Sequence, residues 1–340
     1  MAAFGHAARV LAALQEIATR QFGVFTTAQA LGAGHSREEI RTFLRTRRWA
    51  PVRRGVYCTA ESASGRDERT SHLVATAAVL LVLDGRAAVS HASGAAVHDL
   101  LVPARALAEV RLTDPDEWRR GRGYRVSRAQ LPEEQVVDWG PFAAASIARS
   151  LVDCAREWDL VDAVVAMDDA LHRGLVTPAA LRDVVLGQRH WEGIGGAARA
   201  VSLADARAES PLESRGRVQI VTNGLPVPEL QVDLWAPGGH LGRVDAWYED
   251  AAVAIEFDGR VKYRDPWRGR SSADVLWEEK RREDRLRASG VRVLRWAMAD
   301  VGRDWALSRD RLRALLASPY AGPRDFRVVR DPSSRAGRAS

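Results

Sequence analysis

Cysteine, lysine and long apolar runs are scarce in this chain of 340 residues. Its two cysteines, Cys58 and Cys154, are too few and too far apart in sequence for a disulfide framework or a thiolate metal site, which fits a reducing cytoplasm. The longest apolar run, residues 73–83, is too short to cross a bilayer, and the N-terminus lacks the pattern of a signal peptide. We therefore expect a cytoplasmic protein without a membrane partner.

Arginine supplies nearly all of the positive charge, because Lys262 and Lys280 are the only lysines. The formal net charge of +6 and the pI of about 9.9 favour a polyanionic partner, with nucleic acid as the leading candidate. A chain of this length, with 46% hydrophobic residues, should form more than one domain. The expected fold class is α/β multidomain, with a winged helix-turn-helix over residues 1–60, a mostly helical α/β middle domain over 61–200, a mixed sheet flanked by helices over 201–320 and a disordered tail over 321–340.

A hairpin that carries acids is the strongest chemical signal. Two β-favouring runs, residues 244–248 and 253–258, flank a polar break at residues 249–250. If the turn is centred after Asp250, Asp245 lies opposite Glu256, and Asp258 shares their face of the hairpin. The opposite face would then be apolar and would hold Val244, Ala246, Val253, Ile255 and Phe257.

Acidic side chains on one face of a hairpin repel one another. Cross-strand Cβ atoms lie roughly 5 Å apart, so three acids would raise one another's pKa unless a cation sat between them. An all-oxygen site with open positions suits Mg²⁺ or Mn²⁺. The alternative is a solvated face whose acids pair with nearby arginines. Lys262, four residues past Asp258, favours the metal site, because an ammonium group can stabilise charge on a phosphate.

The spacing of these acids resembles the PD-(D/E)XK nuclease superfamily, specifically the domain similar to very-short-patch-repair endonucleases. The carrying motifs are Glu213, Asp245, the run 255–259, the charged helix 278–287 and the run 290–296. The resemblance implies a restriction-endonuclease-like fold in which Asp245, Glu256 and Glu213 hold Mg²⁺ or Mn²⁺. Asp258 stands where many members have lysine, and Lys262 stands where close relatives often have histidine. With Glu213, Asp245 and Glu256, these two complete the expected catalytic set.

Helical spacing and caps near the N-terminus predict a helix-turn-helix. Residues 9–21 read as a first helix, Thr26 or Thr27 can cap a second, and the capping box from Ser36 to Glu39 opens a third. In the third helix the core-facing stripe is Ile40, Phe43 and Leu44, and another face carries Arg37, Arg41, Arg45 and Arg48. Such an arginine stripe suits a recognition helix in the major groove, and a solvated basic face is the alternative.

A short β-wing comes next, with Arg53 and Arg54 at its tip. Residues 8–60 resemble the winged-helix domain of the AbiEi-type abortive-infection antitoxins, through the runs 23–26, 29–30 and 54–57 and Gly34. The resemblance implies operator binding and autoregulation. It also implies a cognate toxin or another defence protein as a possible partner.

Two further motifs are weaker. Residues 260–270 mix cations with aromatic residues, and Arg264 and Arg268 there could hold a nucleic-acid backbone, although a flexible loop would look similar. A nucleophile built from Ser90, His91, Ser93 and Asp99 is disfavoured, because the sequence shows no glycine-framed elbow and serines beside a helix start are usually caps.

Two functions compete. The first is a DNA-binding, Mg²⁺-dependent endonuclease that hydrolyses phosphodiester bonds in phage defence or DNA repair. The second is an antitoxin-like transcriptional regulator with a catalytically inactive nuclease-like domain. RNA as the substrate also stays open, and the oligomeric state does not follow from the sequence.

Overall fold

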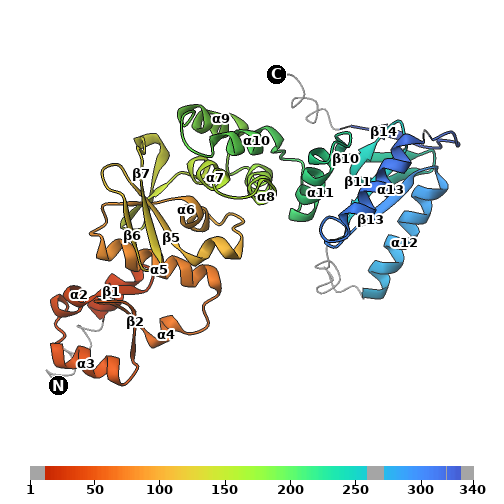
Figure 1. Cartoon of the computed structure of the whole chain (residues 1–340). Helices are drawn as coiled ribbons and strands as arrows, with labels where there is room; N and C mark the ends of the chain where they lie inside the picture. Colours follow the sequence, from red (N-terminus) through yellow and green to blue (C-terminus); the bar gives the residue numbers. More distant parts are fainter. Residues whose placement is uncertain (1–11, 259–271, 319, 331–340) are drawn as a thin grey trace. The chain divides into compact units, whose positions relative to one another are not determined.

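The computed structural model describes residues 12–258, 272–318 and 320–330 (Figure 1). The chain divides into two compact units. The first comprises Met1–Ala166 and Gly174–Ser202, and the second comprises Met167–Arg173 and Leu203–Ser340.

The first unit begins with a winged helix. Residues 12–20 are helical and are followed by β1 (Val24–Thr26), α2 (Thr27–Gly32), α3 (Arg37–Arg45), β2 (Trp49–Arg53) and β3 (Val56–Thr59). The Thr26 side chain caps α2 and the Ser36 side chain caps α3, and in both cases the residue at N3 completes a capping box. The predicted caps and wing are therefore confirmed.

Apolar side chains from every part of the winged helix meet in one cluster. Ile40 of α3 is buried there beside Phe25 and Trp49, while Phe43 and Leu44 pack against it from the side. The predicted core stripe of the third helix is thus confirmed, and the opposite face of α3 is left to polar residues.

A six-stranded sheet with helices comes next in the same unit (Figure 1). Its strands lie in the order β6-β7-β5-β4-β9-β8. The elements are α4 (Ala60–Ala63), α5 (Glu68–Val82), β4 (Ala88–Val89), α6 (His91–Val97), η1 (Ala104–Ala108), β5 (Val110–Asp114), β6 (Arg119–Gly121), β7 (Tyr124–Arg128), η2 (Glu133–Gln135), β8 (Val136–Trp139) and β9 (Phe142–Ala145).

A second apolar cluster joins the winged helix to this sheet. Helix α5 contacts all three strands of the winged helix, β1, β2 and β3, as well as β5 of the larger sheet. Val24 and Val56 of the wing belong to the same buried cluster as Leu80, Leu112 and Val126. The segments on either side of residue 60, predicted as separate domains, therefore form one compact unit.

Ser90 does not cap α6, contrary to the expectation for a serine at a helix start. Its side chain makes no cap hydrogen bond. Instead Ser90 Oγ lies 2.8 Å from His91 Nδ1 and accepts a hydrogen bond from Thr113 Oγ1. The buried hydroxyl finds these partners because β4 and β5 pair directly beside it.

Four helices complete this stretch of chain: α7 (Ile147–Ala155), α8 (Leu160–His172), α9 (Pro178–Gly187) and α10 (Ile194–Leu203). Asp153 is fully buried and pairs with Arg149 at 2.7 Å. Asp168, in the part of α8 that belongs to the second unit, pairs with Arg217 at 2.7 Å. These acids are charge partners inside the fold.

The second unit is a mixed sheet with helices on both faces (Figure 1). Its order is β13-β12-β11-β10-β14, and β12 pairs with β13 in parallel. Helix α11 contacts β12, and α12 contacts β11 and β13. The elements are α11 (Pro211–Thr222), β10 (Glu229–Ala236), β11 (Gly239–Tyr248), β12 (Val253–Phe257), α12 (Ser272–Ala288), β13 (Arg292–Trp296), α13 (Trp305–Ala317) and β14 (Arg327–Val329).

Helix α11 begins at Pro211, because Ser210 caps it and proline suits the first helical position. One expectation for this unit, the disordered tail over residues 321–340, is wrong in part. Residues 327–329, expected within a disordered tail, form β14 and pair with β10. Phe326 packs edge-on against Trp247, and this apolar contact helps to anchor β14. Residues 331–340 of the expected tail lie outside the described residues.

No helix in the described part of the chain is both long and apolar enough to span a bilayer.

Candidate functional site

The exposed face of α3 carries three of the predicted arginines. Arg37, Arg41 and Arg45 are all exposed. Arg41 lies 3.4 Å from Glu38, and both side chains are about three-quarters exposed. Exposed pairs of this kind contribute little and are readily exchanged, so the guanidinium groups can still meet phosphates.

Arg48 does not continue this helical stripe. Helix α3 ends at Arg45, and Arg47 has a left-handed backbone with φ 57°. The exposed Arg48 guanidinium then lies 5.1 Å over the ring of Phe43. It remains near α3, but the helical stripe predicted from Arg37 to Arg48 ends with the helix at Arg45.

The wing separates its two arginines. Strands β2 and β3 pair through Arg53 and Val56, so Arg54 and Gly55 form the turn, and Arg54 is exposed. Arg53 is turned elsewhere: its Nη2 donates to the carbonyl of Arg122 at 2.6 Å. Of these two arginines, Arg54 is thus the one exposed at the tip of the wing.

The predicted register of the acidic hairpin is the observed one. Strand β11 pairs with β12 through Ala246 with Ile255 and Tyr248 with Val253. Carried one step further, this register sets Asp245 opposite Glu256. Asp245 Oδ2 also accepts a hydrogen bond from the amide of Phe257 at 2.8 Å, which fixes the aspartate at the end of β12.

The apolar face of the hairpin was expected to be continuous, and in the structure it is not. Val244 belongs to a cluster with Val232 on one side of the sheet, whereas Ala246 and Ile255 belong to the cluster on the other side. Gln231, which faces the Asp245 position, has φ 55° and interrupts the pairing of β10 with β11. This local irregularity reverses the side-chain alternation at Asp245.

Helix α11 brings Glu213 towards the hairpin. Glu213 Oε2 accepts hydrogen bonds from the amide of Glu209 and from the Gln231 side chain, each at 2.9 Å. Burial raises the pKa of Glu213 above its ordinary value, and the negative charge of Asp245 raises it further. A β-carbon on Gly216 would lie 2.1 Å from the Phe257 ring, so glycine there permits the close approach of α11.

Two arginines meet Glu256, and sequence reasoning missed them. Arg282 of α12 lies 2.9 Å from its carboxylate and Arg295 of β13 lies 3.8 Å away. Burial raises the pKa of Glu256, while these guanidinium charges oppose the rise and Asp245 adds to it. Arg295 also lies 3.7 Å from Asp258. The sequence feature that could have identified Arg295 is its position between the apolar residues Leu294 and Trp296.

The predicted acids divide between two pockets. Asp245, Glu256 and Asp258 line one of about 210 Å³ together with Arg282 and Arg295. Glu213 lines another, which Asp245 and Asp258 also border. Within the described residues, no three His, Cys, Asp or Glu side chains are grouped closely enough to hold a metal ion. Arg282 and Arg295 place positive charge beside Glu256, and the predicted Mg²⁺ or Mn²⁺ site stays a prediction.

Three predicted site residues, Lys262, Arg264 and Arg268, lie outside the described residues. Their expected roles at the acids and on a nucleic-acid backbone stay predictions.

Comparison with known proteins finds a family match for the winged helix. Residues 13–60 match the family model described as "Transcriptional regulator, AbiEi antitoxin". Two proteins of Mycobacterium tuberculosis, "Uncharacterized protein MT2308" of strain CDC 1551 / Oshkosh and "Uncharacterized protein Rv2248" of strain ATCC 25618 / H37Rv, are each 30% identical over 161 residues. The aligned region covers 47% of this chain and 57% of each relative, so the chain spans little more than half of their length.

A solved structure, that of the RV2827C protein from Mycobacterium tuberculosis, aligns with 68% of this chain and 89% of its own at 16% identity and a TM-score of 0.38. The family match lies wholly within the winged helix and supports the predicted N-terminal resemblance. The winged helix of this chain is thus similar to that of the AbiEi antitoxin regulators.

Proposed function

We propose that this protein is a DNA-binding transcriptional regulator of the antitoxin type. The observation that carries the proposal is the exposed basic face of α3, which lies inside the segment that matches the antitoxin family model. A cognate toxin, or another defence protein, is the partner that this family implies.

Helix α3 has the geometry of a recognition helix. Ile40 of its core stripe is buried in the apolar cluster, and Arg37, Arg41 and Arg45 are exposed to solvent. A helix fits the major groove, where arginine reads guanine edges and binds phosphates, and a wing tip contacts the neighbouring backbone. Arg54, exposed at the wing turn, is placed for that backbone contact.

The first test removes charge from α3. Arg41→Ala combined with Arg45→Ala should weaken binding to duplexes that the wild-type protein selects from a random pool, by about tenfold or more. It should also lower the salt slope of log Kd by about 2, because each lost phosphate contact removes about 0.9 from the slope. Fluorescence anisotropy over a salt series measures both quantities.

A matched control removes the same charge from elsewhere in the first unit. Arg182→Ala with Arg199→Ala changes two exposed arginines on α9 and α10 and should leave Kd and the slope near the wild-type values. If the α3 variant behaves like this control, the basic face of α3 is only solvated.

A metal-dependent DNA endonuclease, acting in phage defence or DNA repair, is the second candidate function. The observation that favours it is the register that sets Asp245 opposite Glu256, together with the raised pKa of Glu213 and Glu256. A bound Mg²⁺ or Mn²⁺ would supply an activated water and charge stabilisation for phosphodiester hydrolysis. The described residues fit such an ion poorly, because Arg282 and Arg295 hold Glu256 and no three-acid group forms. We therefore assign no catalytic step to the acids.

Nicking of supercoiled plasmid tests this candidate. Purified protein is incubated with Mg²⁺ or Mn²⁺ beside a Glu256→Ala variant and an EDTA control. Cutting that needs the metal and disappears in the variant would establish the endonuclease. Plasmid that is bound but stays uncut under every condition would rule out the endonuclease and leave the transcriptional regulator as the remaining candidate function.

A further inference from the structure

Two tight turns of the same kind lie side by side in the first unit. Arg54–Gly55 joins β2 to β3, and Arg122–Gly123 joins β6 to β7. The two glycines have φ of 78° and 72°, a conformation that glycine adopts without strain. Each turn thus places an arginine at its tip, and we call the pair the arginine turns. The sequence signal was an Arg-Gly dipeptide in each hairpin, and only the first was recognised.

Arg53 fixes the two arginine turns to each other. Its guanidinium donates to the carbonyl of Arg122 at 2.6 Å and lies 4.9 Å over the ring of Tyr124. A guanidinium over an aromatic face contributes about 0.5–1 kcal/mol at an exposed site. Because Arg122 offers only its carbonyl to this contact, its own side chain stays exposed beside that of Arg54.

A groove of about 820 Å³ borders both arginine turns. Its charged lining residues are Arg53, Arg54, Arg122 and one acid, Glu68. His72 also lines it, and burial lowers the pKa of that ring, so it adds no charge at neutral pH. Three guanidinium groups against one carboxylate leave the groove positively charged, which suits a polyanion.

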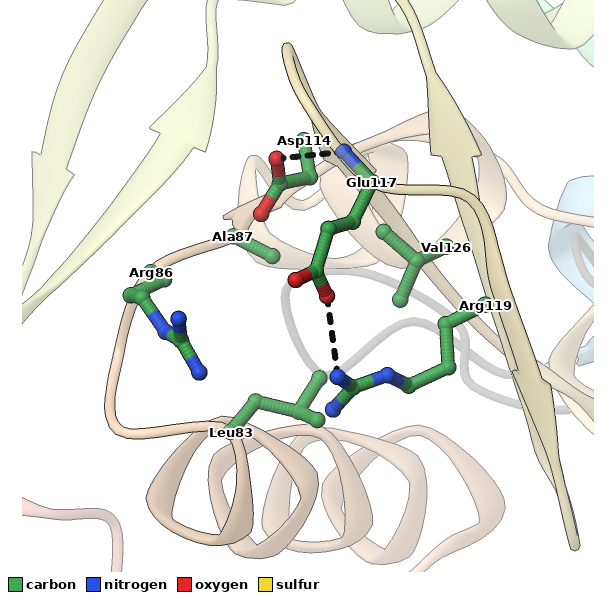
Figure 2. A pocket seen from close by; sticks show the side chains of 7 residues that line it. All are labelled: Leu83, Arg86, Ala87, Asp114, Glu117, Arg119 and Val126. Atoms are coloured by element: carbon green, nitrogen blue, oxygen red, sulfur yellow. Dashed lines mark hydrogen bonds and ion pairs between the residues drawn. The ribbon is translucent and has the colours of Figure 1, made fainter.

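The remaining arginines of the β6–β7 hairpin are neutralised to different degrees. Figure 2 shows Glu117 and Arg119 joined beside a pocket at the base of β6, and their charged atoms lie 2.9 Å apart. Arg125 of β7 lies 3.3 Å from Glu157. Arg120, by contrast, comes no nearer to Glu109 than 3.9 Å, and its side chain is 68% exposed. Arg120 and Arg122 near the tip therefore keep exposed positive charge, as does Arg128 at the other end of β7.

We propose that the arginine turns together hold the sugar–phosphate backbone of one DNA duplex, so that DNA bound by α3 extends over the β6–β7 hairpin. The contact is with phosphates and is independent of sequence. The Tyr124 ring is covered by Arg53 and offers no stacking platform at the tip, which favours a duplex over a single strand. The proposal rests on the proposed function, because it presupposes duplex binding through the wing.

The test removes the charge of the hairpin tip. Arg120→Ala combined with Arg122→Ala should weaken binding of a labelled duplex about tenfold and lower the salt slope by about 2, equally for selected and random sequences. Both side chains are exposed, and the Arg122 carbonyl that holds Arg53 remains, so the fold should be kept. A circular dichroism melt of the variant checks this.

The comparison with other variants separates the two proposals. If the Arg120/Arg122 variant matches the Arg182/Arg199 control while the Arg41/Arg45 variant loses affinity, the hairpin proposal is overturned and the regulator stands. A loss confined to a single-stranded oligonucleotide of the same sequence would also overturn it. If the wild-type protein does not bind duplex DNA at all, both proposals are wrong.

Discussion

His91 is a buried histidine held in an unusual backbone conformation. Its side chain is almost completely enclosed, and its φ of 49° lies in the left-handed region. The pKa of His91 is lowered from 6.5 to about 4, chiefly by burial; the charge of Asp153 opposes this shift, as does that of Glu157, whereas the charge of Arg111 adds to it. The ring is therefore neutral at neutral pH and shares a hydrogen bond with Ser90.

This shift predicts a loss of stability in mild acid. The unfolded chain binds a proton on His91 near pH 6.5, whereas the folded chain does so only near pH 4. The free energy of unfolding is thus fully retained above the unfolded pKa and falls as the pH drops from 6.5 to 4. We expect His91 to account for a loss of about 2 kcal/mol between about pH 7.5 and about pH 5, measured by urea unfolding.

Asparagine at position 91 is the control, because it tolerates a positive φ and does not titrate. His91→Asn should lose clearly less stability than the wild type over the same pH interval. Equal losses in the two proteins would show that other groups, such as His72, whose pKa burial also lowers, cause the acid sensitivity.

Elements whose ends depend on nearby residues could be predicted from the sequence. The Ser36 capping box and the hairpin register at Asp245 each involve residues close together in the chain, and the structure has both. Strand β14, by contrast, lies within the expected disordered tail, because its three residues pair with β10, which is distant in the chain. Local chemistry thus predicted elements that depend on neighbouring residues, and missed one that depends on a distant partner.

Contacts between distant elements could not be predicted. Arg282 of α12 and Arg295 of β13 both contact Glu256, and no residue spacing in the sequence predicts these contacts. The reversal of alternation at Asp245 depends on the backbone of Gln231, where a positive φ is uncommon for such a residue. The register of the acidic hairpin was therefore predicted, while the arginine partners of its acids were not.

At the scale of the whole molecule, the shared apolar cluster makes the winged helix dependent on α5 and the six-stranded sheet. Val24, Val56 and Cys58 are buried against these later elements of the chain. A chain cut at residue 60 would expose these side chains. It would also fall in the size range where a single core is marginal.

Two fragments test this dependence. Residues 1–60 alone should show no cooperative thermal transition by circular dichroism, whereas residues 1–202 should melt cooperatively, because they include the sheet. A cooperative melt of the shorter fragment, with duplex binding equal to that of the full chain, would show that the winged helix folds without its neighbour.

The shared apolar cluster also sets an order of events during synthesis. The winged helix leaves the ribosome before the sheet, yet Leu112 and Val126, which share a buried cluster with its Val24, are translated later. At roughly 5–20 residues per second, several seconds pass before they emerge. A nascent chain should therefore acquire its affinity for DNA only after β7 has emerged, so that translation itself delays the onset of binding.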